Sequence, residues 1–476
     1  MSVRIEHGDC REVLVGMEPS SVQCCITSPP YFGLRDYKLE PLVWGGEADC
    51  EHEWSARRYY REGGGSVGSH EAFSKPGPEN AERLKRTRWR EDTLCRRCGA
   101  WRGQLGLEPT PELYLAHIVE CFRAVKRVLR KDGTLWLNMG DVYAATGKFG
   151  GGTQGERYSQ VGAKARYGKG TWEPVPFGLK PKDLMLMPFE VARALRADGW
   201  WLRSDIIWAK PNPMPESVTD RPTQAYKHVF LFSRAERYFY DAEAVRERAI
   251  GCNAHDLTGQ GYAAPGQTQQ KGNREKGRTR GLPPRHSQYD SSARESLDDV
   301  GRGIGRNLRN VWEIATAPYP KAHFATFPPK LVEPMVKAGT SEKGCCPECG
   351  GPWIRETETE YRKNRPSAGN DPRSRSEDKQ ALGSPGGHHG WRGNNLLAET
   401  ATVGWSPSCS CTNDDIRTIN DAVSCTILDP FSGAGTVGLV ADRLGRDAIL
   451  IDSKAEYCEM ARERVEADAG LFAGVT

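Results

Sequence analysis

The sequence predicts an α/β protein whose core is a largely parallel sheet with an antiparallel β-hairpin at one edge. Residues 425–465 read as strand, glycine turn, helix, strand and helix, and such a βαβα unit requires a parallel sheet. An amphipathic helix at 110–133 is followed directly by a buried strand. Two apolar runs that flank a proline-rich loop, at 200–210 and 228–241, predict the hairpin.

Two elements open the chain. The segment "VRIEHGD" at 3–9 predicts a strand with Asp9 at its end, and "VQCCI" at 22–26 predicts a short buried strand. Neither Pro29 nor Pro30 has an N–H to donate, so the second strand stops and residues 28–31 form a stiff loop at its carboxyl end. In open parallel sheets ligands bind at that edge, although the same residues also suit a plain proline turn.

The middle of the chain supplies helices and the hairpin. Thr110 is a helix N-cap, Pro111 occupies the first turn, and Gly133 is expected to end the helix before a strand at 134–141. A second helix is expected at about 188–197, and the hairpin strands that follow are joined by a loop at 211–222.

A glycine-rich turn lies near the C-terminus. Gly433, Gly435 and Gly438 have G-x-G-x-x-G spacing between a strand and a helix, and Asp452 closes the next strand. Glycines allow a cofactor to approach the backbone, and a carboxylate at that distance can accept hydrogen bonds from ribose hydroxyls. The geometry fits a nicotinamide dinucleotide or S-adenosylmethionine, and the alternative is a bare structural turn.

Composition limits the classes of protein. Of 476 residues only 38% are hydrophobic, so we expect polar loops at about 61–90, 145–175, 250–305 and 355–400. The net charge is +4, with basic clusters at 83–97 and 271–285 that suit either a solvated surface or a polyanion such as DNA. The sequence contains no apolar stretch of about 18 residues, so we expect a cytoplasmic protein with no membrane partner.

The chain has fifteen cysteines, many in short pairs, which favours metal binding in a reducing compartment over disulfides. Four soft ligands in two short pairs suit a structural tetrahedral zinc site, and the competing interpretation is reduced surface thiols. Two such sets are present, and Cys345 is an alternative to Cys346 in the second. The first set is Cys50, His52, Cys95 and Cys98, and the second is Cys346, Cys349, Cys409 and Cys411.

Two motifs carry a resemblance to a known family. The segments "TSPPY" at 27–31 and "DPFSGAGT" at 429–436 resemble the catalytic and cofactor motifs of DNA amino-methyltransferases, and their order resembles that of the β group. The resemblance implies a circularly permuted Rossmann-like methyltransferase sheet, cut between neighbouring elements, with zinc-stabilised insertions. The implied catalytic domain comprises 1–40, 108–245, 308–340 and 421–476; the zinc-binding insertions are 41–107 and 341–420, and the target-recognition region is 246–307.

The resemblance also implies roles in binding S-adenosylmethionine. Asp9 would contact the adenine end and Asp452 the ribose, while the segment "HFATFPPKLVEPMVKAGT" would complete the pocket. The full implied set of cofactor-binding residues is Asp9, Thr326, Phe327, Asp429, Phe431, Gly433, Gly435, Thr436 and Asp452.

The chemistry of amine methylation explains the loop at 28–31. An exocyclic amine is a poor nucleophile, so hydrogen-bond acceptors such as the Ser28 hydroxyl and the Pro29 carbonyl, held rigid by Pro30, would orient it toward the methyl donor. Tyr31 would stack on a base flipped out of the duplex. The chain has no Pro-Cys dipeptide for methylation of the cytosine ring carbon, and serine before Pro-Pro-Tyr resembles the cytosine-N4 enzymes.

The predicted function is therefore a site-specific DNA methyltransferase that forms N4-methylcytosine in double-stranded DNA, with adenine N6 as the alternative target. A nicotinamide-dependent oxidoreductase would leave the 27–31 motif unused. A noncatalytic zinc-ribbon DNA-binding protein would leave the glycine turn unused. The expected partners are DNA and, in a restriction-modification system, a companion restriction endonuclease, with the chain as a monomer or homodimer.

Overall fold

The structure is a computed structural model in which two compact units are distinguished. The first comprises Met1–Asp241, Arg309–Trp353 and Pro407–Thr476, and the second comprises Ala242–Leu308 and Ile354–Ser406. The residues described are 2–58, 89–144, 179–180, 182–248, 305–317, 319, 326–363, 396–411, 422–469 and 474–475.

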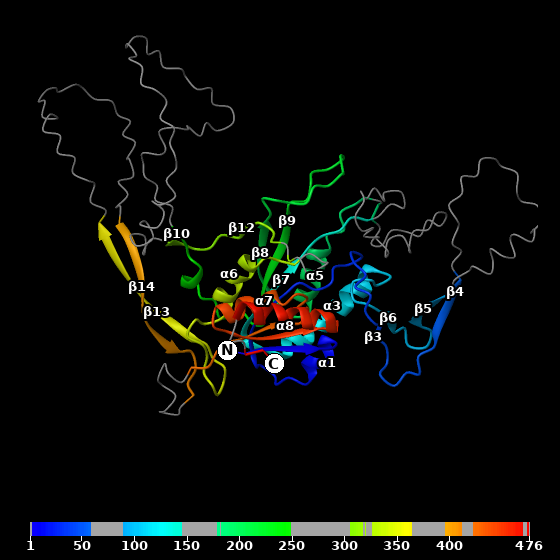
Figure 1. The fold of residues 1–476 in the computed structure, drawn as a ribbon, viewed down its shortest axis with the longest axis horizontal. Coiled ribbons are helices and arrows are strands. Elements are labelled where there is room, and N and C mark those ends of the chain that lie inside the picture. The colour runs from blue at the N-terminus through cyan, green and yellow to red at the C-terminus, as the bar shows by residue number, and fades with distance from the viewer. Residues whose placement is uncertain are drawn as a thin grey trace, which may run out of the picture. The chain divides into compact units, whose positions relative to one another are not determined.

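The first unit is built on a sheet that has eight strands among the described residues, in the order β1-β16-β15-β2-β7-β9-β8-β12 (Figure 1). The strands in chain order are β1 (Val3–His7), β2 (Val22–Thr27), β7 (Leu129–Met139), β8 (Trp201–Ala209), β9 (Tyr226–Ser233), β12 (Val311–Glu313), β15 (Thr426–Asp429) and β16 (Asp447–Asp452). Every neighbouring pair from β1 to β7 is parallel, and β9 is antiparallel to both β7 and β8. The predicted mixed α/β class with a mostly parallel sheet is confirmed.

The strands from the two ends of the chain pair with one another in the parallel half of this sheet. β1 pairs with β16, and β2 pairs with β15, so that Cys24 lies opposite Ile427. The Thr27 hydroxyl donates to the Asp429 carboxylate at 2.7 Å, which joins the carboxyl ends of two strands about 400 positions apart in sequence. The blue and red ends of the ribbon accordingly lie together in Figure 1.

Helices cover both faces of the sheet because side chains alternate along its central strands. Leu135 and Leu137 of β7 share a buried cluster with Phe122 of α3 (Pro111–Val128). On the opposite face, a Cβ on Gly339 of α6 (Pro329–Gly339) would lie 3.2 Å from Trp136 Nε1. The other helices described in this unit are α1 (Cys10–Val15) and α5 (Met187–Ala197), which pack with α3, α7 (Thr436–Arg443), which packs with α6, and α8 (Ala455–Ala469), which packs with α7.

One predicted boundary is wrong. Thr110 does cap α3, accepting from the Leu113 N–H at 3.3 Å, but the helix ends at Val128 and β7 begins at the next residue. Gly133 lies inside that strand, where a Cβ would come within 2.8 Å of the Gln23 carbonyl oxygen. The glycine therefore marks a close approach of two strands, not the end of a helix.

The hairpin also differs in detail from the prediction. β8 and β9 form the antiparallel pair, but β9 runs from Tyr226 to Ser233 and does not include 234–241. The pair is not the edge of the sheet, because the short strand β12 adds in parallel outside β8.

The segment at 41–107 folds as a small four-stranded sheet in the order β3-β6-β5-β4. Its strands are β3 (Leu42–Trp44), β4 (Trp54–Arg58), β5 (Trp89–Cys95) and β6 (Trp101–Gly103). Trp44 and Trp101 are buried in the same cluster as α3, so this segment shares the core of the first unit. Residues 59–88 lie outside the described residues.

The second unit contains η2 (Glu243–Val245) and two small sheets. β10 (Glu247–Arg248) pairs with β11 (Gly305–Arg306), and β13 (Trp353–Lys363) pairs with β14 (Leu396–Pro407). The two longer strands occupy both ends of the segment predicted as a loop at 355–400, so that prediction is wrong there. The basic segment at 271–285 and the predicted loop at 145–175 lie outside the described residues.

Candidate active site

A pocket opens at the carboxyl ends of the central parallel strands, between the two turns that follow β2 and β15. It encloses about 1270 Å³ of empty space, its open mouth included. Eleven of the thirteen predicted catalytic and cofactor-binding residues line it: Asp9, Ser28, Pro29, Pro30, Tyr31, Thr326, Phe327, Phe431, Gly433, Thr436 and Asp452. Asp429, at the end of β15, and Gly435, within the glycine turn, are not among the lining residues.

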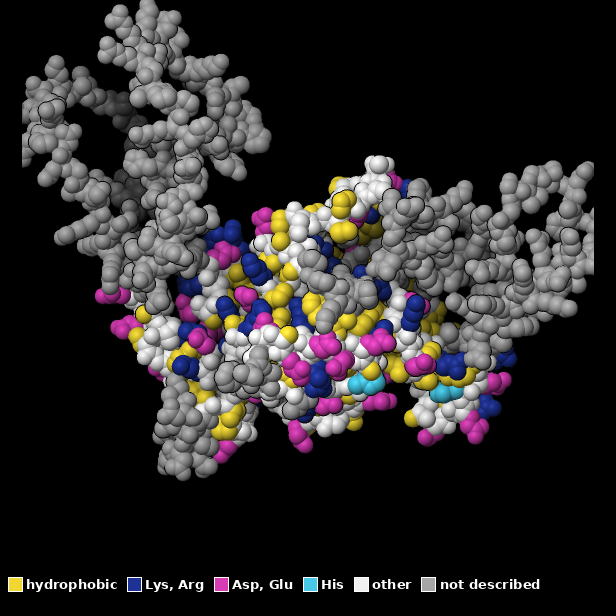
Figure 2. Space-filling view, in the orientation of Figure 1, with side chains coloured by type: hydrophobic (Ala, Val, Ile, Leu, Met, Phe, Trp, Pro, Cys, Tyr) yellow, Lys and Arg dark blue, Asp and Glu magenta, His cyan; other side chains and the backbone are white. Residues whose placement is uncertain are grey.

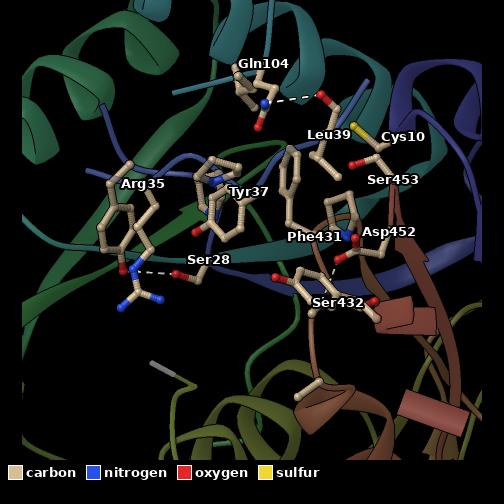
Figure 3. A pocket seen from close by; sticks show the side chains of 18 of the residues that line it. Cys10, Ser28, Arg35, Tyr37, Leu39, Gln104, Phe431, Ser432, Asp452 and Ser453 are labelled. Atoms are coloured by element: carbon tan, nitrogen blue, oxygen red, sulfur yellow. Dashed lines mark hydrogen bonds between the residues drawn. The ribbon is translucent and has the colours of Figure 1, made fainter. Parts of the chain in front are cut away.

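Figure 3 shows how the two halves of the pocket face each other. Ser28 and Arg35 lie on one side, Asp452 and Ser453 lie on the other, and the rings of Tyr37 and Phe431 stand between them. The pocket thus joins an apolar, aromatic middle to polar groups at both ends, as in most small-molecule sites.

The glycine turn is held by the carboxylate at the end of the neighbouring strand. The Gly433 N–H donates to Asp452 Oδ2 at 2.8 Å, and the Lys454 N–H donates to Asp452 Oδ1 at 2.9 Å. Burial raises the pKa of Asp452 to about 6. Each carboxylate oxygen keeps a lone pair that can accept from a hydroxyl in the pocket.

Gly435 is required for close packing as well as for the turn. Its φ is +68°, and a Cβ there would lie 2.7 Å from the Cβ of Ala461 on α8. Both the left-handed backbone and the helix contact exclude a side chain.

Gly435→Ala is therefore expected to lower the free energy of unfolding by about 3 kcal/mol, because backbone strain and overpacking add. Urea denaturation measures this. Gly33→Ala is the matched control, since Gly33 has φ +66° but no atom within 4 Å of the added Cβ. Equal losses in the two variants would show that the contact with Ala461 contributes nothing.

A second buried carboxylate, that of Asp429, is hydrogen-bonded to the backbone at the start of the glycine turn. Asp429 Oδ1 accepts from the Thr27 hydroxyl and from the Phe431 N–H at 3.1 Å, whereas Oδ2 is buried with no hydrogen-bond partner. Burial raises the pKa of Asp429 to about 7. An unpartnered buried carboxylate oxygen is destabilising by itself, so a positive group bound nearby would stabilise its ionised form.

Asp9 is less available than its position predicts. It lines the pocket and caps α1, but both of its oxygens are bound by Arg11, the shorter contact being 2.6 Å. The same guanidinium lies 3.7 Å over the ring of Trp44. Asp9 thus joins β1 to the 41–107 segment as well as facing the pocket.

The Ser-Pro-Pro-Tyr corner is fixed by hydrogen bonds from three directions. Ser28 Oγ lies 3.0 Å from the Tyr31 hydroxyl, and Asn138 Nδ2 donates to Ser28 Oγ at 3.4 Å. The Tyr114 hydroxyl on α3 donates to the Pro30 carbonyl at 2.9 Å. The serine hydroxyl is therefore held in a defined orientation at the carboxyl end of β2.

Tyr31 is more enclosed than a free stacking platform would be. Its ring is 9% exposed, and Lys227 Nζ lies 4.7 Å from the ring centroid and 3.1 Å from the hydroxyl. Lys227 therefore occupies the space over this face of the ring.

The prediction missed several lining residues, among them Asn138, Lys227, Arg35, Tyr37 and Tyr457. Asn138 had a usable signal, because it is a polar residue at the carboxyl end of an apolar strand. Lys227 had none, since it lies at the amino end of β9. That end reaches the pocket only because β9 is antiparallel to β7.

Both predicted metal-ligand sets come together. In each set the four ligand atoms lie within 4.8 Å of one another. Cys50 Sγ and Cys95 Sγ are 3.9 Å apart, and Cys98 Sγ is 3.4 Å from His52 Nδ1. Tetrahedral zinc with bonds of about 2.3 Å places its sulfur ligands roughly 3.8 Å apart, so this geometry fits the ion. Cys346, not Cys345, belongs to the second set.

Stacked rings and hydrogen bonds link the segment that carries the first ligand set to the pocket. The His117 ring on α3 is stacked between Trp44 and Trp101, at 5.0 and 5.4 Å, and its Nδ1 lies 3.0 Å from the buried Glu108. Glu108 accepts from the Gly106 N–H at 2.8 Å.

Gly106 in turn supports the catalytic corner. Its carbonyl accepts from the Gly33 N–H at 2.7 Å, and a Cβ on Gly106 would lie 2.9 Å from the Tyr31 carbonyl oxygen. Leu42, Trp44, Gln104 and Leu105 of the same segment line the pocket, and Figure 3 shows Gln104 donating to the Leu39 carbonyl at 3.2 Å. The 41–107 segment is thus one wall of the site.

Comparison with known proteins places this site in a family. A family model described as DNA methylase, of the N6 and N4 methyltransferase type, matches residues 22–346 and 419–463. The Type II methyltransferase M.XycI of Xanthomonas campestris pv. cyanopsidis is 33% identical over 334 residues, which are 70% of this chain and 71% of that protein. The Type II methyltransferase M.SmaI of Serratia marcescens is 27% identical over 98% of this chain and 91% of its own.

A solved structure of the PvuII DNA methyltransferase (cytosine-N4-specific) aligns with 97% of this chain and 87% of its own, at 14% identity and a TM-score of 0.40, a likeness too distant to support any conclusion. Within the described segments no helix combines the length and the apolar character needed to span a bilayer. The family match covers both sequence motifs and the strands that bring them together. The chain belongs to the N6/N4 family of DNA methyltransferases.

Proposed function

We propose that this protein is a site-specific DNA methyltransferase that transfers the methyl group of S-adenosylmethionine to the exocyclic N4 amine of a cytosine flipped out of double-stranded DNA. The observation that carries the proposal is the single pocket lined both by Ser28 and by the glycine turn with Asp452. A methyl acceptor at the first and a methyl donor at the second would meet within one enclosure.

The chain's own residues fit the proposed donor. The Asp452 oxygens have free lone pairs for ribose hydroxyls, and Phe431 and Tyr37 offer aromatic surface for an adenine ring. The unpartnered Asp429 oxygen supplies negative charge behind the turn. When bound, S-adenosylmethionine supplies an electrophilic methyl group on a sulfonium ion.

On the acceptor side, the residues orient an amine without forming a covalent bond to it. The hydroxyl of Ser28, held by Asn138 and Tyr31, accepts a hydrogen bond from the amine and turns its lone pair toward the methyl group. Pro29 and Pro30 keep this acceptor from moving, because the ring of each fixes its φ. The serine in this motif favours cytosine, and adenine N6 remains the alternative target.

We also propose roles for the segments outside the catalytic domain. Residues 41–107 and 341–420 each hold one structural zinc ion through the two ligand sets, and 246–307 contributes to target recognition. DNA is the macromolecular partner, and a companion restriction endonuclease is proposed from the Type II names of the relatives. The exposed face of α8 carries Glu456, Glu459, Glu463, Glu466 and Asp468, and Figure 2 shows acidic side chains gathered there, so DNA would approach from another side.

The test is incubation of the protein with methyl-labelled S-adenosylmethionine and unmodified DNA of varied sequence, followed by mass spectrometry of the nucleosides. Labelled N4-methylcytosine is the expected product. Labelled N6-methyladenine would replace cytosine by adenine in the proposal. No label in DNA, together with tight binding of a nicotinamide dinucleotide, would reject it.

A pH dependence of cofactor binding follows from the two buried carboxylates. The pKa is raised to about 6 for Asp452 and to about 7 for Asp429, mainly by burial. The ionised carboxylates accept hydrogen bonds more strongly than the protonated groups, and only they carry the charge that attracts the sulfonium. Affinity for S-adenosylmethionine should therefore be constant above about pH 8 and fall below pH 7, by up to tenfold for each pH unit per group. Isothermal titration calorimetry measures it.

Without the cofactor, the free energy of unfolding should change with pH in the direction opposite to the affinity. An Asp429 carboxyl in the unfolded chain ionises near pH 3.9, whereas the folded one stays protonated until about pH 7. The folded state thus binds more protons across that interval, and its free energy of unfolding declines as the pH rises through it. Affinity and stability that both rise with pH would contradict the assignment of Asp429. Asp429→Asn should remove much of both trends.

A further inference from the structure

Lys227 is a polar residue of the pocket to which the proposed reaction gives no role. It lies at the start of β9, opposite Trp208 on β8, and reaches the corner that follows β2. Its Nζ is 3.1 Å from the Tyr31 hydroxyl, and that hydroxyl is 3.0 Å from Ser28 Oγ. Three polar groups therefore form a continuous hydrogen-bonded chain from the serine to the lysine.

The middle of this path, at the buried Tyr31, is closely packed. The Tyr31 hydroxyl also has contacts at 3.4 Å with the backbone carbonyl and the side-chain amide of Asn138. A Cβ on Gly140 would lie 3.0 Å from the Tyr31 ring and 3.5 Å from Lys227 Cε, so glycine at this position allows the two side chains to meet. The chain is a packed feature of the fold, not an incidental surface contact.

We infer that this chain is the exit path for the proton released when the base amine is methylated, with Lys227 as the proton acceptor. The inference rests on the proposed function and adds a residue to it. Asn138 and Gly140 hold the path, and Ser28 is its entrance.

The step balances in atoms and charge. The lone pair of the amine nitrogen forms a bond to the methyl carbon, and the carbon–sulfur bond breaks with its electron pair staying on sulfur. The methylated nitrogen, now positive, gives a proton to Ser28 Oγ. The hydroxyl proton of Ser28 moves to Tyr31, and that of Tyr31 moves to the neutral amine of Lys227. The products are the N-methylated base, the neutral thioether and a Lys227 ammonium ion, which later loses its proton to water.

The electrostatic surroundings suit this direction of transfer. Burial, with a smaller contribution from the positive charge of Arg35, lowers the pKa of Lys227 to about 8, so that a neutral amine is accessible near neutral pH. Burial raises the pKa of Tyr31 to about 12, and the phenol therefore passes a proton on without remaining ionised. Lys210, which directly follows β8, is a further cation near this group, and burial and the Lys227 charge lower its pKa to about 8 as well.

The experiment is a pH profile of methyl transfer in a single turnover, at saturating S-adenosylmethionine and DNA. The wild-type rate should rise about tenfold per pH unit below about pH 8 and level off above it. Lys227→Arg keeps the charge but holds its proton, because arginine does not titrate in this range. Its rate should be at least tenfold lower, with no inflection. Tyr31→Phe keeps the ring and removes the middle of the path, so its profile should also be flat.

Two further variants separate a proton path from a structural contact. Lys227→Met should also abolish the inflection while binding S-adenosylmethionine as tightly as the wild type does, which shows that the variant is folded. Lys210→Met should retain the inflection at the same pH, because the positive charge that lowers the pKa of Lys227 is that of Arg35.

A Lys227→Arg enzyme with the wild-type rate and profile would show that Lys227 only supports the ring, and would overturn the inference. A wild-type enzyme that methylates DNA at a rate independent of pH would overturn the path and leave the proposed function intact. A wild-type enzyme that transfers no methyl group to DNA would overturn both.

Discussion

Ser28→Ala should slow methyl transfer about 100- to 1,000-fold and leave the affinity for S-adenosylmethionine within about twofold of the wild-type value. The reason is that the hydrogen bond from the amine to the Ser28 hydroxyl strengthens as the nitrogen becomes positive, so its loss costs more in the transition state than in the bound substrate. Tyr31 and Asn138 hold this hydroxyl in place, and alanine offers them no replacement partner.

Single-turnover kinetics would measure the rate, and calorimetry would measure the affinity. Ser233→Ala is the control, because its hydroxyl is also hydrogen-bonded, donating to the Ala235 carbonyl at 2.7 Å, but lies at the carboxyl end of β9 and does not line the pocket. Parallel losses of rate and affinity in Ser28→Ala would mean that Ser28 only shapes the cofactor pocket.

Cys98→Ser should remove one zinc ion per chain and lower kcat/KM about 100-fold. The first ligand set lies in the segment that forms a wall of the pocket, and Gly106 of that segment contacts the backbone of the catalytic corner. A structural zinc site contributes its binding energy to folding, so its loss should loosen the wall and displace the corner. A displacement of about 1 Å is enough to cost roughly 100-fold in rate.

Elemental analysis for zinc, paired with steady-state kinetics, checks this prediction. Cys411→Ser should lose the other zinc ion with much less effect on the rate. In that set the Cys349 carbonyl accepts from Arg130, and the carbonyl of the neighbouring Gly350 accepts from Gln23. These contacts lie near the amino ends of β7 and β2, away from the pocket. Cys458→Ser, outside both sets, should retain both ions. Loss of zinc from Cys98→Ser with undiminished activity would show that the first site does not support the corner.

The sequence allowed many of the local elements to be predicted. The proline pair after an apolar strand, the capped helix beginning at Pro111, and the glycine turn between β15 and α7 are each determined by neighbouring residues, through missing N–H groups, hydrogen-bonded caps and positive φ. Where local signals competed, prediction failed. Gly133 has the sequence context of a helix end, but a side chain is excluded there because the backbone of β2, 110 positions earlier in the sequence, lies too close.

The site residues that were predicted also differ from those that were missed in whether local or long-range contacts place them. Residues within the two motifs were predictable because the chemistry of the pocket acts on consecutive positions. Lys227, Asn138 and the wall formed by residues 42–44 and 104–105 were missed, since each reaches the pocket through strand pairing or packing between distant segments.

From the sequence alone came the two motifs, the two sets of metal ligands and the mostly parallel character of the sheet, because all of these depend on short-range spacing. Only the tertiary structure decided that Tyr31 is covered by Lys227, that Asp9 is paired with Arg11 and that the 41–107 segment forms one side of the pocket. Such contacts depend on strand order and direction, which long-range burial determines and no local pattern of residues encodes.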